Sequence, residues 1–395
     1  MGTRPSLDGL RVVDLSRVLA GPYCAQMLAD HGADVIKVEG PAGDETRHWG
    51  PPFLANGTSA YYTNLNRNKR NVVVDLGGAA GREVVDRLLD RADVVVENFK
   101  AGTLERWGWD RDTLRERFPR LVHCRITGFG VDGPLGGMPG YDAVLQAYSG
   151  LMSINGAAGG PPTRVGVPVV DAVTGMHAFS GILLALYERE TSGLGQLVDV
   201  SLLDSAVSLL HPHSGTWLAD GSQAPRSGSA HPTVAPYDAF PAADGPVFIG
   251  VGNDRQFGLL ARALGAPELI EDPRFRHNPD RVRNRDTLRE RLVALLGGRT
   301  RDEVTTELLA QGVPVSPVHD VGEALSSPQV RHRGLVVEGD GYRGIGVPVT
   351  LERSPGRAVP SVHRAGTDTR DVLAELGYDS AAIDAAITEG VVGER

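Results

Sequence analysis

The chain has 395 residues, of which 41% are apolar and 23% are charged, an ordinary composition for a globular protein. Acidic residues (49) outnumber basic ones (40), and the net charge of −9 gives no bulk attraction to nucleic acid or to an anionic membrane. The length predicts two domains, and the composition excludes collagen-like, coiled-coil and disordered classes.

The cysteine content and the hydropathy of the chain indicate its cellular compartment. The chain has two cysteines, Cys24 and Cys124, too few for a disulfide framework and consistent with a reducing cytosol. Residues 1–16 lack the apolar core of a signal peptide. The longest continuous apolar runs, such as 181–187, are shorter than the roughly 18 residues that a membrane span needs. We expect a cytoplasmic protein with no membrane partner.

The first part of the chain alternates between strand and helix patterns. Short apolar runs predict strands at 10–15, 33–39, 71–76, 93–97, 121–126 and 196–200. Helical patterns follow at 23–31, 79–90, 172–190 and 201–210, with a loop at 16–22 after the first strand. Strands joined by helices of this length predict an α/β fold with parallel βαβ units.

The second part of the chain begins with a segment rich in Pro, Gly, Ser and His. This segment, 211–236, is predicted to be a linker. A second unit follows, with a strand at 247–251, helices at 254–264, 283–296 and 300–311, and an extended segment at 313–318. The last predicted helix covers 369–376.

Three local patterns point away from common chemistries. Residues 128–133 have the G-x-G-x-x-G spacing, but 134–139 read as a loop and not as the helix that a dinucleotide site requires, so we expect a glycine-lined wall and no nicotinamide. The chain has no G-x-S-x-G elbow that would indicate a serine hydrolase. His211 and His213 lack neighbouring metal ligands, so we expect no metal.

Asp171 ends an apolar run at the predicted start of a long helix. One interpretation is an N-cap, which is worth about 1 kcal/mol. The other is a carboxylate nucleophile, which at its ordinary pKa is already ionised at neutral pH and needs no activating base. Helix-terminal N–H groups would then hold it and stabilise an oxyanion.

A basic cluster, Asn-Arg-Asn-Lys-Arg at 66–70, stands out in this acidic chain. It has two interpretations: a solvated entry to the third strand, or a contact for the phosphates of a nucleotide-like ligand.

Several segments in order carry a family resemblance: LDGLRVVDLSRVLAGP (7–22), GADVIKVE (32–39), NRNKR (66–70), DVVVENF (93–99), GYD (140–142), GQLVDVSLLD (195–204) and GND (252–254). With these segments the chain resembles the family III CoA-transferases, which include formyl-CoA transferase, carnitine CoA-transferase and the α-methylacyl-CoA racemases. The resemblance implies a large Rossmann-like CoA-binding domain from 1–210 and 328–395, a smaller α/β domain from 237–327, and an interlocked homodimer.

The resemblance also implies a mechanism in which Asp171 is the nucleophile and an N-cap role is secondary. Asp171 would attack the acyl-CoA donor to form a mixed anhydride, and CoA thiolate would convert this to an aspartyl-CoA thioester. A carboxylic acid acceptor would then take the CoA through a second anhydride. Because each step exchanges one activated acyl group for another, the reaction would need neither ATP nor metal.

The CoA contacts implied by the resemblance follow the first, fourth and fifth predicted strands. They are Arg17, Val18, Leu19, Ala20, Asn98, Phe99, Arg106 and Tyr141. Formyl-CoA transferase-like members have a glutamine at the position of Leu19 and a glycine-run loop where this chain has 250–254, so we expect other acyl groups, bulkier or less polar. Arg47 or Arg164 are candidates for holding a second substrate carboxylate.

Two alternatives stay open. Racemases pair a histidine with the aspartate where this chain has Tyr141, and a tyrosine with an ordinary pKa near 10 is a poor base at neutral pH. A non-catalytic acyl-CoA-binding protein would lose only affinity when Asp171 is replaced.

Overall fold

The computed structural model of the chain describes residues 4–339, 342–359 and 364–394. It divides into two compact units. Unit 1 consists of Met1–Ser149, Gly166–Leu209 and Pro328–Arg395, and unit 2 consists of Gly150–Val165 and Leu210–Ser327. Gly150–Val165, which the sequence placed with the large domain, therefore belongs to unit 2.

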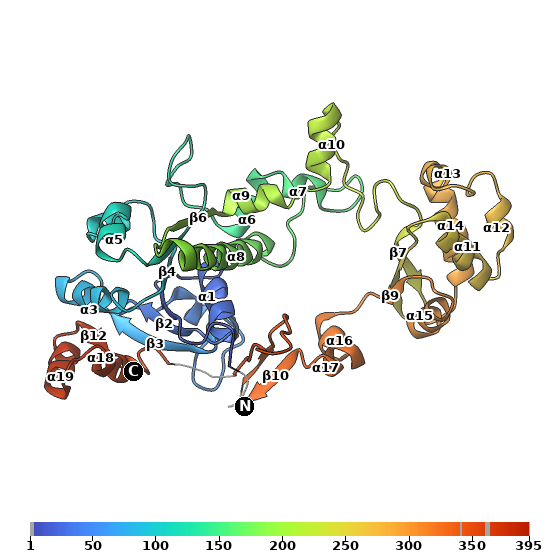
Figure 1. Cartoon of the computed structure of the whole chain (residues 1–395). Helices are drawn as coiled ribbons and strands as arrows, with labels where there is room; N and C mark the ends of the chain where they lie inside the picture. Colours follow the sequence, from blue (N-terminus) through green and yellow to red (C-terminus); the bar gives the residue numbers. More distant parts are fainter. Residues whose placement is uncertain (1–3, 340–341, 360–363, 395) are drawn as a thin grey trace. The chain divides into compact units, whose positions relative to one another are not determined.

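Unit 1 is built on a seven-stranded sheet in the order β12-β3-β2-β1-β4-β5-β6. Figure 1 labels β12, β3, β2, β4 and β6 of this sheet. All neighbours pair in parallel except β12, which is antiparallel to β3. The order β3-β2-β1-β4-β5-β6 is the Rossmann order, which confirms the predicted parallel α/β fold. The strands are β1 (Arg11–Asp14), β2 (Asp34–Glu39), β3 (Lys69–Val74), β4 (Val94–Glu97), β5 (Val122–Thr127), β6 (Leu197–Ser201) and β12 (Val392–Gly393).

The helices of unit 1 include all those predicted before residue 210. Unit 1 contains α1 (Ala20–Asp30), the 3-10 helix η1 (Glu45–His48), α2 (Ala60–Asn66), α3 (Ala79–Leu89), α4 (Thr103–Arg106), α5 (Arg111–Arg117), α6 (Asp142–Tyr148), α8 (Val169–Ser192), α9 (Leu202–Ser208), α17 (Pro328–His332), α18 (Thr369–Glu375) and α19 (Ser380–Thr388), with a hairpin of β10 (Val336–Gly339) and β11 (Tyr342–Ile345).

Two boundaries in unit 1 differ from the sequence prediction. Helix α1 begins at Ala20 and not at Tyr23, because Pro22 falls in the first turn, where a missing N–H leaves no hydrogen bond unmade. The helix predicted for 369–376 is also not the last element of secondary structure. The chain continues through α19 to β12, which extends the sheet beyond β3.

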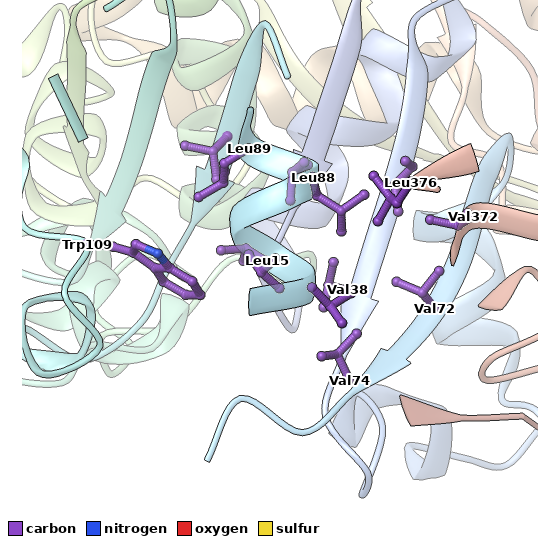
Figure 2. Packing of buried hydrophobic residues seen from close by; sticks show 14 of the residues in the cluster. Leu15, Val38, Val72, Val74, Leu88, Leu89, Trp109, Val372 and Leu376 are labelled. Carbon is purple, nitrogen blue, oxygen red and sulfur yellow. The ribbon is translucent and has the colours of Figure 1, made fainter. Parts of the chain in front are cut away.

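The core of unit 1 lies between the sheet and the helices α3 and α18. Leu88 of α3 and Val372 of α18 are fully buried together with Val72 of β3 (Figure 2). Val72 belongs to a run of buried valines, Val72–Val74, in β3. Such near-continuous apolar runs are expected in parallel strands that are covered on both faces.

Helix α8 is the long helix that the sequence predicted, and it packs against α1, β5 and β6. A Cβ atom on Gly175 of α8 would stand 2.8 Å from the Ala20 carbonyl oxygen, so the small residue lets α1 and α8 approach closely. In the part of the chain that the structure describes, α8 is the one helix long and apolar enough to cross a membrane, with a hydropathy of 1.6 and 39% of that window buried. Polar residues interrupt this helix, so it contains no continuous apolar run of membrane-spanning length.

The cations of the basic cluster at 66–70 are all paired with carboxylates, and those of Arg67 and Lys69 are buried. Arg67 pairs with Asp30, and both side chains are buried. Lys69 is 2% exposed and donates to the Asp14 carboxylate at 2.9 Å. Arg70 pairs with Asp34. Both sequence interpretations of this cluster are therefore wrong, because the tertiary fold brings a carboxylate to each cation.

Unit 2 has its own core around a three-stranded antiparallel sheet in the order β7-β8-β9. The segment predicted as a linker contains α10, and β7 was not predicted. The elements are α7 (Leu151–Ile154), α10 (His213–Asp220), β7 (Tyr237–Ala242), β8 (Gly245–Gly250), α11 (Asp254–Ala263), α12 (Glu268–Glu271), α13 (Asn278–Arg283), α14 (Arg285–Leu296), α15 (Arg301–Ala310), β9 (Val315–Pro317) and α16 (Val321–Ser326).

The buried pair of Lys69 and Asp14 yields a stability prediction. We expect Lys69→Met to lower the free energy of unfolding by about 3–5 kcal/mol, because it leaves the Asp14 carboxylate buried without its partner. Urea unfolding of the variant beside Lys100→Met, which removes an exposed lysine, measures the difference. Equal losses in the two variants would contradict the role assigned to this pair.

Candidate active site

A cavity of about 240 Å³ opens at the carboxyl ends of β1, β4 and β5 in unit 1. Strand order reverses between β1 and β4, and the crevice at such a reversal is where open α/β sheets bind ligands. The lining residues are Arg17, Val18, Leu19, Ala20, Glu45, Asn98, Phe99, Lys100, Ala101, Ile126, Thr127, Gly128, Gly130, Gly137, Met138, Pro139, Gly140, Tyr141, Asp171 and Leu202.

The loop between β1 and α1 is held by side chains on both of its sides. The Asn98 side chain accepts from the Arg17 N–H at 2.9 Å and donates to the Arg17 carbonyl at 2.7 Å. The buried ammonium of Lys37 donates to the Ser16 carbonyl at 2.8 Å. Val18 has a φ of 71°, a left-handed conformation that a β-branched residue adopts only under constraint. This loop is therefore shaped before any ligand arrives.

The opposite wall is made by glycines, as the sequence predicted. The G-x-G-x-x-G segment follows β5 as turns and not as a helix, and Gly128 and Gly130 line the cavity. A Cβ atom on Gly128 would stand 2.7 Å from the Gly140 backbone nitrogen. The two backbone segments touch here, and only glycine permits that approach.

Asp171 lies in the first turn of α8 and its side chain lines the cavity. It is not an N-cap, because the N-cap position is Pro168. The N–H groups of Val170 and Asp171 instead donate to Oδ2 of Asp142, at 2.8 and 3.2 Å. The expectation that these N–H groups hold the Asp171 carboxylate is therefore wrong, because a carboxylate from α6 occupies them.

The electrostatics of Asp171 also differ from the sequence expectation. Its side chain is half-buried, and among the described residues none donates a hydrogen bond to its carboxylate. Burial, and then the negative charge of Asp142, raise the pKa of Asp171 to about 7. The carboxylate is thus only about half ionised at neutral pH, and not fully ionised as its ordinary pKa implied.

The cavity brings together most of the predicted site residues. Asp171, Arg17, Val18, Leu19, Ala20, Asn98, Phe99 and Tyr141 all line it. Arg106 does not line it: this residue is exposed on α4 and donates to Thr103 Oγ1 at 3.1 Å. Its role as a CoA contact stays a prediction.

Four ionisable residues at or near the site had no role in the sequence analysis: Lys100, Glu45, Tyr61 and Asp142. Lys100 and Glu45 line the cavity. Burial, followed by the charges of Asp171 and Asp142, raises the pKa of Tyr61 to about 12, which places Tyr61 in the electrostatic field of the two carboxylates. Lys100 directly follows the Asn98–Phe99 pair that the resemblance singled out, and that adjacency is the one signal that could have found it.

Arg47 cannot hold a substrate carboxylate as the sequence allowed. Its guanidinium is buried and donates to both carboxylate oxygens of Glu39 at 2.7 Å, and also to the Tyr62 hydroxyl at 2.7 Å. The pair belongs to the interior of unit 1. Arg164 lies in unit 2, where it is exposed.

Comparisons with known proteins agree with this geometry. The family model described as CoA-transferase family III matches residues 7–369. A succinate–glutarate CoA-transferase of Agrobacterium fabrum is 40% identical over 94% of this chain and 96% of its own length. A succinyl-CoA:mesaconate CoA-transferase of Haloarcula hispanica is 41% identical over 89% of each chain.

A solved structure extends the likeness to the whole fold. The crystal structure of a CAIB/BAIF family protein from Brucella suis matches with a TM-score of 0.86 and 39% identity, over 94% of this chain and 100% of that one. The family match, the relatives and the fold thus coincide with a cavity that holds the predicted aspartate. The chain belongs to CoA-transferase family III and is an enzyme that transfers CoA between an acyl-CoA and a carboxylic acid.

Proposed function

We propose that this enzyme moves CoA between dicarboxylic acids and that Asp171 carries the transfer. The position of Asp171 supports this most directly: its carboxylate lines a cavity at the strand-order reversal, and among the described residues it accepts no hydrogen bond. A carboxylate in that state keeps its lone pairs available for attack.

The bond changes balance without any further reactant. An oxygen of Asp171 bonds to the thioester carbon of the donor and the CoA thiolate leaves, which gives a mixed anhydride. The thiolate attacks Cγ of Asp171, and the donor acid leaves as its carboxylate. The acceptor carboxylate then attacks the aspartyl thioester and displaces the thiolate, which finally attacks the acceptor acyl carbon and restores Asp171. No net proton, electron pair or water is consumed.

Two cations line the cavity beside the carboxylates of Glu45 and Asp171, and they fit anionic substrates. Arg17 and Lys100, both exposed, line the same cavity in a chain whose net charge is −9. They provide the local positive charge that phosphate-bearing acyl-CoA and dicarboxylates require. The preference for dicarboxylates is supported by the names of the relatives, which act on succinate, glutarate and mesaconate.

The alternatives have less support. Among the described residues no histidine lines the cavity, and Tyr141 is 60% exposed at its edge, so an α-proton exchange would lack a neutral-pH base opposite Asp171. A binding protein without chemistry would have no use for a carboxylate kept unpaired in the cavity.

A crossed exchange assay tests the proposal. We expect CoA to pass from succinyl-CoA to glutarate and other free dicarboxylates, and to pass poorly to matched monocarboxylates. Asp171→Asn should lower the rate on the order of 10³-fold or more, because no nucleophile remains. New thioesters are read by mass spectrometry.

The same variants separate the alternatives. Asp171→Asn should fold, and it should unfold at a higher temperature than wild type at pH 8, because it removes a half-buried charge that the fold disfavours. Exchange that persists in this variant would refute the nucleophile role. Incorporation of solvent deuterium at the α-carbon without CoA exchange would favour the racemase alternative.

A pH profile follows from the pKa of Asp171, which is raised to about 7. Protonated Asp171 cannot attack, so the exchange rate should rise with pH through neutrality and reach about one-tenth of its plateau at pH 6. Dicarboxylate substrates titrate below about pH 5–6 and contribute little to this limb. An exchange rate that does not change between pH 5.5 and pH 8.5 would contradict the raised pKa of Asp171.

We also propose a cytoplasmic, interlocked homodimer. Both cysteines are free and buried, which fits a reducing compartment. Leu184 and Tyr187 on α8 are 71% and 81% exposed in the single chain, and large apolar side chains at that exposure favour burial against a second copy.

Light scattering after size-exclusion chromatography measures this association. Leu184→Glu with Tyr187→Glu should shift the mass toward the monomer, since each charge would be desolvated at the interface. Ser192→Glu, at the exposed end of the same helix, is the matched control and should leave the mass unchanged. A wild-type monomer would refute the dimer.

A further inference from the structure

A second carboxylate stands at the start of α8, and the steps of the proposed transfer do not use it. Asp142 opens α6 and is 8% exposed. Its Oδ2 accepts from the N–H groups of Val170 and Asp171, and its Oδ1 accepts from Nε2 of Gln146 at 2.6 Å. Every hydrogen bond the structure gives Asp142 therefore points at helix ends or at a buried amide, and none points into the cavity.

The N-terminus of a helix ordinarily stabilises a nearby carboxylate. Its first N–H groups are unpaired donors and carry a partial positive charge. If they bound Asp171, they would lower its basicity and turn its oxygens toward the helix. In this chain the acceptor is Asp142, so the donors beside the nucleophile are already occupied.

We propose that Asp142 is a positioning residue of the CoA transfer: it takes the first N–H groups of α8 for itself and thereby leaves the Asp171 carboxylate unbound, directed into the cavity and nucleophilic. This inference rests on the proposed function of Asp171. It assigns two roles to two neighbouring carboxylates by hydrogen bonding and by the negative charge of the bound one: the carboxylate that is bound holds the helix, and the one that is not bound reacts.

The electrostatic surroundings agree with this assignment. After burial, the charge of Asp142 is the cause that raises the pKa of Asp171. The other ionisable groups at the site are Tyr61 on α2, whose pKa is raised to about 12 by burial and then by nearby carboxylates, and Glu45, Arg17 and Lys100 along the cavity wall. A more basic carboxylate is the better nucleophile toward a thioester carbon.

Replacing Asp142 by asparagine removes its charge but keeps its acceptor for α8. The amide oxygen of Asp142→Asn can still accept from the N–H groups of Val170 and Asp171, while its NH2 group no longer accepts from Gln146 Nε2. In a plot of kcat against pH, the rising part at low pH is the acid limb. We expect this acid limb to move to lower pH by about one unit in Asp142→Asn. The plateau value of kcat should fall several-fold, while KM for the acyl-CoA changes little, because the cavity wall keeps its shape.

Two further variants distinguish this role from a purely structural one. Asp142→Glu restores the charge and should return the limb toward the wild-type pH. Asp112→Asn removes a first-turn carboxylate from α5, outside the cavity, and should leave the profile unchanged. If Asp142→Asn does not fold, Asp142→Ser supplies a short neutral acceptor in its place, with the same expected shift.

The outcomes are separable from those of the proposed function. An active wild type whose exchange depends on Asp171, combined with an unshifted limb in folded Asp142→Asn, would overturn this inference and leave the transfer itself standing. A wild type without exchange would instead refute the proposed function. A shifted limb that returns in Asp142→Glu supports both.

Discussion

Two buried ion pairs beneath the carboxyl ends of the central strands hold the part of unit 1 on which the cavity depends. Lys69 pairs with Asp14, and Lys37 pairs with Asp44 at 3.2 Å, with all four side chains nearly inaccessible. Burial alone would raise the pKa of Asp14, but the two ammonium groups outweigh it and lower that pKa. Such charges are tolerated inside a protein only when each is fully partnered, so their geometry is sharply specified.

The same two lysines also fix the position of the loop between β1 and α1, which lines the cavity. Lys37 reaches the Ser16 carbonyl, and Lys69 reaches the Pro22 carbonyl at 2.8 Å, so the two lysines hold the loop on either side of Val18. A dinucleotide-binding Rossmann domain shapes the same loop with glycines. Here side chains perform that task, which allows a β-branched residue to occupy a left-handed conformation at the cavity edge.

The sequence pattern predicted the elements well where one signal dominated. Apolar runs located β1, β2, β4 and β5, because buried parallel strands need such runs whatever surrounds them. The pattern failed where partners come from far along the chain. Arg67 and Lys69 read as a surface cluster because Asp30 and Asp14, which neutralise them, are tens of residues away. Likewise β12, a strand of two residues, exists only because β3 offers it an edge.

The sequence by itself determined the family and the parallel fold, and it pointed to Asp171 as the proposed nucleophile, since these inferences depend on residue types in a fixed order. Only the tertiary structure decided how that aspartate behaves. The N–H groups expected to stabilise Asp171 donate to Asp142 instead, and burial, followed by the negative charge of Asp142, raises the pKa of Asp171 to about 7. Hydrogen-bond partners and desolvation are properties of three-dimensional neighbours, and Asp142 and Asp171 become neighbours only when α6 meets the first turn of α8.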